Sequence, residues 1–427
     1  MEMSRADEQA ISGWLRDNAL PIRHLEAGNG FEDLQPLQQI LRDVKIVGLG
    51  EATHGTREFV QLKHRLFEFL VIEMGFTVFA LEASSAACQP LNDYIVSGIG
   101  DLDAALTDQH YVVWDIEEIA ALVEWLRRHN EGVPDARKVH FYGVDFSYNE
   151  NGRKAVLGYL SRVAPERVDR VAALFNALAE EEAKWPVRID AESQAAIRQL
   201  LPTVQALADD LSTSRAQLID KSSSAEHDGI QQLLTRMEQW CSLDGLGRSR
   251  YMADNLISVL EREESTAKAI IWQHNAHINV QTPPNGEQTL GSALREKYGA
   301  AYYGFALEFN QGSYLTRIEV PQQSLQDLRT VTIGPAPAHS LPWYLAGAGL
   351  DAFLIDLHRQ PANPVIQQWL DSARIMHNVS WAYKDPDSCL QEVAFGVQFD
   401  GLIFVEHTTP TRPTHNALET VAKREGL

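Results

Sequence analysis

Five residues whose side chains could transfer protons lie in two short motifs and at one single position. Glu51-Ala-Thr-His54 and His274-Asn-Ala-His277 each place two titratable groups three residues apart, and Glu82 lies between the motifs in the chain. A neutral imidazole can take a proton from water near neutral pH and hand it to a leaving group. A nearby glutamate can orient that ring and stabilise its charged form. We therefore treat these five residues as the candidate catalytic groups.

These residues follow segments that have the composition of β-strands. Apolar and β-branched runs predict strands at 44–49, 77–81, 139–144 and 269–272. They are followed by Glu51, Glu82, Asp145 and His274. Helical periodicity predicts helices between the first three of these strands, at 58–74, 91–99 and 116–128. This alternation predicts parallel strands. Because ligands bind at the carboxyl ends of such strands, we expect the four side chains to share one edge of the sheet.

The rest of the chain completes a fold in three parts. Helices without intervening strands are predicted at 167–182, 192–211, 230–240 and 251–262, and further strands at 302–309, 314–320, 353–355 and 402–405. We predict an α/β fold with a mostly parallel central sheet flanked by helices, and an all-helical insertion. Residues 1–160 form the first part of the core, which carries Glu51, His54 and Glu82. Residues 161–262 form the insertion, a lid or cleft wall, and residues 263–427 form the second part of the core, which carries His274 and His277.

The overall composition disfavours several classes of partner. The formal net charge of −21 disfavours nucleic acid and anionic lipid, because binding to both depends on basic residues. No apolar run has the length to cross a bilayer, and the polar first residues lack a secretory pattern. Cys88, Cys241 and Cys389 lie far apart, which favours a reducing compartment over a disulfide framework. We expect a cytoplasmic protein, of open oligomeric state, that binds a small, hydrophobic, neutral or cationic molecule.

The sequence lacks several motifs of covalent catalysis and nucleotide binding. There is no G-x-S-x-G nucleophile elbow and no G-x-x-x-x-G-K-[ST] loop, and Gly48-Leu-Gly50 lacks the third glycine of a dinucleotide site. Cys88 is interpreted as a buried apolar thiol. Water activated by histidine is therefore the favoured nucleophile. The first turn of the helix after Gly55 is expected to offer N–H groups to a hydroxide or oxyanion beside His54.

The same histidines and glutamates leave a metal site open. Three histidines and two glutamates could hold zinc or manganese for metal-assisted hydrolysis. However, their H-x-x-H and E-x-x-H spacings lie in predicted loops, without the helical H-E-x-x-H geometry that fixes zinc ligands. We favour a site without a metal or other cofactor, and a divalent ion at the cluster is the alternative.

Several of these segments resemble a known family. Gly48-Leu-Gly-Glu-Ala-Thr-His-Gly-Thr-Arg-Glu-Phe59 and Gly75-Phe-Thr-Val-Phe-Ala-Leu-Glu82 are similar to the opening signature of the erythromycin esterase family, which includes hydrolases related to succinoglycan biosynthesis. The likeness continues in order through nearly the whole chain, at 114, 124–126, 142–145, 248–255, 273–277 and 399–404. It implies the erythromycin esterase-like α/β fold, which differs from the α/β-hydrolase fold.

The resemblance also implies an activity and a set of residue roles. It implies hydrolysis of an ester or lactone by water, with His54 as the general base and Glu82 supporting it. Glu51, His274 and His277 would belong to the same cluster. The family places an arginine in the helix after the first motif, where this chain has Lys63. The residues expected to bind substrate are Glu58, Lys63, Asp145 and Arg248.

Three functions are compatible with these residues. The first is a hydrolase that cleaves an ester or macrolactone of a hydrophobic natural product, with macrolide inactivation, and hence antibiotic resistance, among its forms. The second is a biosynthetic enzyme of the same fold that uses His54 for elimination or cyclisation. The third is a metal- or ligand-binding protein without turnover. The resemblance favours the first.

Overall fold

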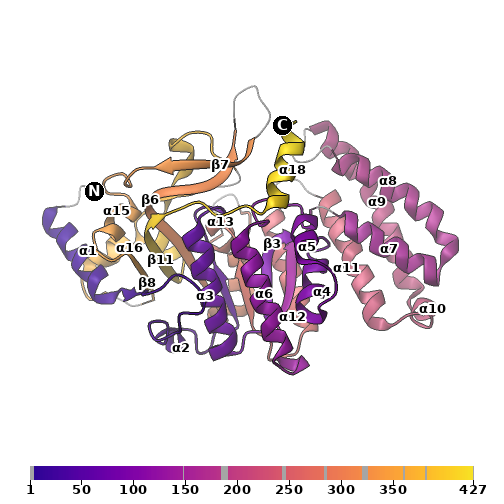
Figure 1. The fold of residues 1–427 in the computed structure, drawn as a ribbon, viewed down its shortest axis with the longest axis horizontal. Coiled ribbons are helices and arrows are strands. Elements are labelled where there is room, and N and C mark those ends of the chain that lie inside the picture. Colours follow the sequence, from indigo (N-terminus) through magenta and orange to yellow (C-terminus); the bar gives the residue numbers. More distant parts are fainter. Residues whose placement is uncertain are drawn as a thin grey trace.

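The computed structural model describes residues 4–147, 149–183, 191–242, 247–282, 286–319, 326–358, 361–379 and 382–426. These residues form a central sheet with helices on both faces and a helical unit beside one edge (Figure 1). None of the described helices combines the length and the apolar composition that a membrane crossing requires.

The central sheet is mostly parallel, as predicted. Its parallel strands are, in spatial order, β4 (His140–Asp145), β3 (Val78–Ser84), β5 (Ala269–Trp272), β2 (Ile46–Leu49), β6 (Tyr302–Ile318) and β11 (Gly401–Thr408). Antiparallel strands β8 (Ala352–Asp356) and β1 (Leu20–Pro21) extend the β11 side, and β7 (Gln326–Ile333) pairs with the distal half of β6. The four strands that precede the candidate residues, β2, β5, β3 and β4, are therefore neighbours.

Strand β6 differs from its prediction. The polar residues 310–313 interrupt the apolar pattern, and we predicted separate strands at 302–309 and 314–320, of which residue 320 lies outside the described residues. The structure has one strand, because β11 pairs with β6 through this stretch and places Thr408 opposite Gly312. Gly312 has a φ of +131°, and a Cβ there would lie 2.3 Å from the Thr408 carbonyl oxygen.

The two-stranded sheet of β9 (Arg374–His377) and β10 (Leu390–Val393) was not predicted.

Alternation of side chains along the strands gives the sheet two apolar faces. Phe79 and Leu81 of β3 pack in one cluster with α3 (Arg57–Met74), α4 (Gln89–Ser97), α5 (Leu102–Asp108) and α6 (Glu117–Glu131). Val78 and Ala80 pack on the opposite face with α12 (Arg248–Arg262) and α14 (Leu290–Tyr298). Helix α3 ends at Gly75, as predicted, where a left-handed residue caps it.

The helical unit has its own core but not the predicted limits. Its helices are α7 (Glu150–Val163), α8 (Val168–Glu182), α9 (Ala191–Thr213), α10 (Arg215–Ile219) and α11 (Ser224–Cys241), and they share one apolar cluster. Helix α7 begins before the predicted boundary at 161. Helix α12 lies inside the predicted insertion, yet its apolar stripe packs on the sheet. Helices α7 and α12 are both amphipathic. The sequence alone therefore did not show that α7 packs in the helical unit and α12 on the sheet.

The remaining helices include those on the β8 side, those near the termini, and the short α13 after β5. They are α1 (Arg5–Asn18), α2 (Leu37–Ile40), α13 (Asn275–Ile278), α15 (Leu341–Ala346), α16 (Pro364–Asp371), α17 (Phe395–Gln398) and α18 (His415–Glu425). Helix α18 contacts α5 and β7. The stretch before it, residues 409–414, crosses the start of α3 through a bridge at Thr56 and the start of α6 through a bridge at Ile116.

Candidate active site

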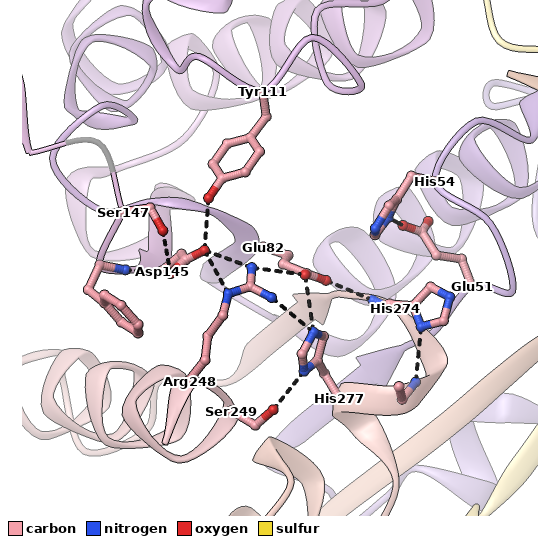
Figure 2. Close-up of polar contacts among 12 residues, drawn as sticks. Glu51, His54, Glu82, Tyr111, Asp145, Ser147, Arg248, Ser249, His274 and His277 are labelled. Atoms are coloured by element: carbon pink, nitrogen blue, oxygen red, sulfur yellow. Dashed lines mark hydrogen bonds and ion pairs between the residues drawn. The ribbon is translucent and has the colours of Figure 1, made fainter. Parts of the chain in front are cut away.

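The predicted meeting of side chains at one edge of the sheet is present. Glu51 follows β2, His274 follows β5, Glu82 lies near the end of β3, and Asp145 is the last residue of β4. The register of β3 against β4 shifts between Leu81 and Ser84, which is an irregularity of the kind that re-aims a side chain beside a site. Figure 2 shows the resulting cluster, with Glu82 between the Glu51–His54 pair and the side chain of Arg248.

Close backbone packing brings these loops together. A Cβ at Gly50 would lie 2.2 Å from Oδ1 of Asn275, so only glycine fits at that position. The side-chain amide of Asn275 donates to the Leu307 carbonyl and accepts the Leu307 N–H. The backbone N–H of Asn275 donates to the Glu51 carbonyl at 2.9 Å. Asn275 therefore ties the loop after β5 to β2 and β6.

Glu51 is the buried centre of a chain of charges. Its Oε1 lies 2.6 Å from Nδ1 of His54, and its Oε2 accepts hydrogen bonds from Nζ of Lys63 at 2.6 Å and from Nε1 of Trp272 at 3.0 Å. Burial alone would raise the pKa of Glu51, but the charge of Lys63 and the contacts with His54 lower it overall. Glu51 is therefore a carboxylate that holds the His54 ring in one orientation.

His54 has the arrangement expected of a general base. Its Nδ1 is held by Glu51, so that a neutral ring carries its proton there and has its lone pair on Nε2. Among the described residues no hydrogen bond occupies Nε2, and the side chain is 17% exposed. Burial opposes the charged ring, yet the hydrogen bond and charge of Glu51 raise the pKa of His54 above its usual value. The edge-to-face ring of Trp114, 5.2 Å away, packs beside it.

Glu82 is the carboxylate that contacts both Arg248 and His277. Its Oε1 lies 3.1 Å from Nη2 of Arg248 and 3.2 Å from Nε2 of His277, and its Oε2 accepts the His274 N–H at 3.0 Å. Arg248 also bonds Asp145 through Nη2 at 2.7 Å and Nε at 3.1 Å. Burial would raise the pKa of Glu82, but His277 and Arg248 hold it well below its usual value. Glu82 and Asp145 thus fix the Arg248 guanidinium, whose side chain remains 33% exposed.

His277 can bond in two ways with the same nitrogen. Its Nδ1 lies 2.8 Å from Oγ of Ser249, and its Nε2 lies between Glu82 Oε1 and Nη1 of Arg248, at 3.2 and 3.3 Å. With a proton on Nε2 the ring donates to Glu82, and without it the nitrogen accepts from Arg248. Both nitrogens of His277 therefore have a hydrogen-bond partner in either neutral tautomer of the ring.

His274 lies in the cluster but both of its ring nitrogens are occupied by the backbone. Nε2 donates to the Ala52 carbonyl at 3.2 Å, and Nδ1 accepts the Ala276 N–H at 3.2 Å as the N-cap of α13. Burial, with His54 nearby, lowers the pKa of His274 to about 4, so the ring is neutral. This geometry assigns it to holding the Ala52 loop beside His54.

Two residues that we expected to bind substrate are placed elsewhere. The Lys63 side chain is fully buried beneath Glu51, with Nζ 4.6 Å from the Trp272 ring centre, so a substrate cannot reach it. Glu58 uses both carboxylate oxygens on Thr409, accepting its N–H at 2.7 Å and its hydroxyl at 2.6 Å. Asp145 and Arg248, by contrast, lie in the cluster as predicted.

The start of α3 also differs from its expected role. The N–H of Arg57, in the first turn, donates to the Thr409 carbonyl at 2.9 Å, and the chain after Thr409 covers this end of the helix. That N–H is therefore not offered to an oxyanion beside His54. Of the two cations of the cluster, Arg248 has a partly exposed side chain, whereas that of Lys63 is fully buried.

Comparison with known proteins identifies the family. The model of the erythromycin esterase family matches residues 71–408, which is most of the chain. The chain belongs to the erythromycin esterase family. It is 26% identical over 299 residues to erythromycin esterase type II of Escherichia coli, covering 63% of this chain and 69% of that protein. Membership of the erythromycin esterase family supports a hydrolase of the esterase type.

Solved structures of related proteins have the same fold. A protein from Bacillus cereus superposes with a TM-score of 0.79 at 24% identity, covering 96% of this chain and 99% of that one. A mutant of erythromycin esterase EreC in its open conformation superposes with a TM-score of 0.66 at 18% identity, covering 89% of this chain and 95% of that one. The predicted erythromycin esterase-like α/β fold is therefore confirmed.

The family match and the cluster overlap only in part. The matched range begins at residue 71, so it contains Glu82, Asp145, Arg248, His274 and His277 but not Glu51, His54 or Lys63. The assignment of His54 as a candidate general base therefore depends on the geometry described above. In the described part of the chain no group of three or more His, Cys, Asp or Glu side chains is arranged to hold a metal ion. Independence from metal remains a prediction.

Several contacts of this erythromycin esterase family site were not predicted. Trp272 supports Glu51, Tyr111 donates to Asp145 Oδ2 at 2.9 Å, and Ser249 contacts His277. Trp114 donates its indole N–H to the Glu82 carbonyl at 3.0 Å. Two positions carried a signal: Trp114 belongs to the family likeness, and Ser249 lies within the matching segment 248–255. Tyr111 carried none, because it reaches Asp145 from a loop.

Proposed function

We propose that this chain hydrolyses an ester or lactone of a small hydrophobic molecule, with His54 activating water. The single observation that supports this most strongly is the His54 ring itself. Its Nδ1 is held at 2.6 Å by the buried Glu51, while Nε2 has no hydrogen bond from the described residues. A ring held on one side with its lone pair open on the other is what proton removal from a bound water requires.

The proposed step uses the two charged groups on either side of the site. His54 Nε2 takes a proton from water as the water oxygen attacks the carbonyl carbon. The negative charge that develops on the carbonyl oxygen is stabilised by the Arg248 guanidinium, which Glu82 and Asp145 hold in place. The bond to the leaving oxygen then breaks, and His54 returns the proton that it took from water to that oxygen. The products are a carboxylic acid and an alcohol, which remain one molecule if the substrate is a lactone.

The charge of the cluster supports a neutral or cationic substrate. The cluster contains three carboxylates and two fixed cations, which is an excess of one negative charge before any charge on the histidines is counted. The carboxylates are Glu51, Glu82 and Asp145, and the cations are Lys63 and Arg248. An anionic substrate would be repelled at close range. We include macrolide lactones among the proposed substrates because the related protein from Escherichia coli is an erythromycin esterase.

The test combines a substrate panel with isotope labelling. The purified chain is incubated with macrolides, other lactones and simple esters in ¹⁸O-labelled water, and the mass of each product is measured. Hydrolysis places one labelled oxygen in the new carboxylate. Product without labelled oxygen would instead indicate elimination or cyclisation at the same base and would refute the proposal.

A matched pair of variants tests the role of His54. His54→Asn is expected to lower kcat by about 10²–10⁴-fold, because a general base is removed. His140 is the control, since its Nδ1 also contacts a glutamate, Glu263 at 3.2 Å, but at the start of β4. His140→Asn is expected to retain full activity. Equal activities of the two variants would contradict the assignment of His54.

A further inference from the structure

A large cavity lies between the α/β core and the helical unit, away from the candidate catalytic residues. Its volume is about 810 Å³, and its walls come from α4, β4, α7, α11 and α12. In Figure 1 these helices meet beside the edge of the sheet, where α11 faces the core. A cavity of this size holds a small organic molecule.

An arginine without a partner lines this cavity. Arg236, on α11, is 4% exposed, and its Nε has no hydrogen-bond partner among the described residues. No described carboxylate lies within ion-pair distance of its guanidinium. Burial, followed by the nearby charge of Arg262, lowers the pKa of Arg236 to about 10 against the opposing charge of Asp254, which forms no ion pair with it, so the side chain is still charged at neutral pH.

The other buried arginines of the chain show what this position lacks. Arg65 is fully buried and is bonded to Asp33 and to two backbone carbonyls. Arg153 is bonded to Glu182. Burying a charge without a partner is costly, and proteins normally supply an anion or avoid the burial. Among the described residues no anion pairs with Arg236 in this way, and the residue lines a cavity.

The chemistry of the wall indicates the class of ligand. We propose that the cavity is an accessory binding site for a small organic anion, whose carboxylate or phosphate group is held by Arg236 with Arg262 beside it. A guanidinium presents a planar fork of N–H donors that matches both groups in two parallel hydrogen bonds. Apolar side chains of Phe141, Leu233 and Val259 line the same cavity and would contact an apolar body attached to the anion.

The experiment measures anion binding directly and does not depend on catalysis. Inorganic phosphate and phenyl phosphate are titrated into the full chain by isothermal calorimetry at constant ionic strength set with chloride. Saturable binding is expected for both, with phenyl phosphate the tighter. Arg236→Met keeps the length of the stem but removes the charge, and is expected to raise the Kd at least about tenfold, as the loss of a charged hydrogen-bonding partner does.

The control variant removes an arginine of the same unit outside the cavity. Arg170 is exposed on α8 and contacts Asp210, so Arg170→Met is expected to bind both probes as the unmodified chain does. If Arg236→Met does not fold, Arg236→Lys replaces it, since it keeps the charge but loses the fork. Absence of saturable binding to the unmodified chain, or an unchanged Kd in the Arg236 variant, would overturn the proposal.

Discussion

Replacing Lys63 by methionine should move the pH dependence of catalysis while leaving the substrate site untouched. Lys63 contacts Glu51 Oε2 and His54 contacts Glu51 Oε1, each at 2.6 Å, so the cation and the base share one carboxylate. The charge of Lys63 lowers the pKa of His54 and so opposes the stronger effect of Glu51. Without Lys63, His54 should hold its proton to higher pH. A protonated ring cannot take a proton from water, so activity at neutral pH should fall.

The size of the effect follows from the distance between the two charges. Two contacts of 2.6 Å across one carboxylate place Nζ of Lys63 and the His54 ring about 6 Å apart, and at an effective dielectric of about 20 the charges interact by about 3 kcal/mol. Relaxation of Glu51 would reduce this figure. We therefore expect activity at neutral pH to fall by roughly 10- to 100-fold, since about 1.4 kcal/mol corresponds to a factor of ten.

The assay is the pH profile of kcat/KM on the best substrate of the panel. In Lys63→Met the acid limb should move to higher pH, and much of the lost activity should return as the pH is raised. Arg65→Met is the matched control, because Arg65 is an equally buried cation on α3 that bonds Asp33 instead of Glu51. That variant should lose stability without moving the limb. An unmoved acid limb in Lys63→Met, or a limb moved to lower pH, would refute the electrostatic link.

Two further predictions concern Glu58 and His64. Glu58→Gln should lower the free energy of unfolding by about 1 kcal/mol, because it weakens hydrogen bonds to Thr409, and should leave kcat/KM unchanged. Lost activity at unchanged stability would restore a substrate role to Glu58. Burial, with a smaller effect of Arg128, lowers the pKa of His64 to about 4, so the unfolded state binds more protons between about pH 6.5 and 4 and stability falls as the pH falls through that window. In urea unfolding at pH 7 and 4.5, His64→Phe should lose about 2–3 kcal/mol less than the unmodified chain, whereas equal losses would contradict the prediction.

The sheet and its functional edge could be predicted because both leave a local signal. Short apolar and β-branched runs predicted β2, β3, β4 and β5 to within three residues at each end, and helical periodicity predicted α3 and its end at Gly75. Parallel strands then place whatever follows them at one edge, so that Glu51, Glu82, Asp145 and His274 meet without any further information. The sequence could not show that these four strands are adjacent in the sheet. Their adjacency brings the four side chains close together.

Individual side-chain roles were less predictable, because they depend on what each ring or charge contacts. His274 and His277 are three residues apart in one motif, yet one has both nitrogens bonded to backbone and the other contacts Arg248, Glu82 and Ser249. Nothing in the motif distinguishes them. The long polar stretch in β6 and the helix α12 were assigned wrongly for a similar reason, since pairing with β11 and packing on the sheet are tertiary effects.

The burial of Lys63 changes where substrate choice can reside. From the resemblance we expected Lys63, at the position of an arginine, to bind substrate, although lysine cannot make a bidentate contact. In the structure its single ammonium contacts Glu51 and is closed off from solvent, so it acts on the base and cannot contact a substrate. Exchange between lysine and arginine here should change the basicity of His54 more than the choice of substrate. The choice of substrate must then depend on groups that face the site. Arg248 is one such group, since it is charged and its side chain is partly exposed. Hydrolysis with an altered pH profile and an unaltered substrate range is accordingly the expected behaviour of any Lys63 variant that folds.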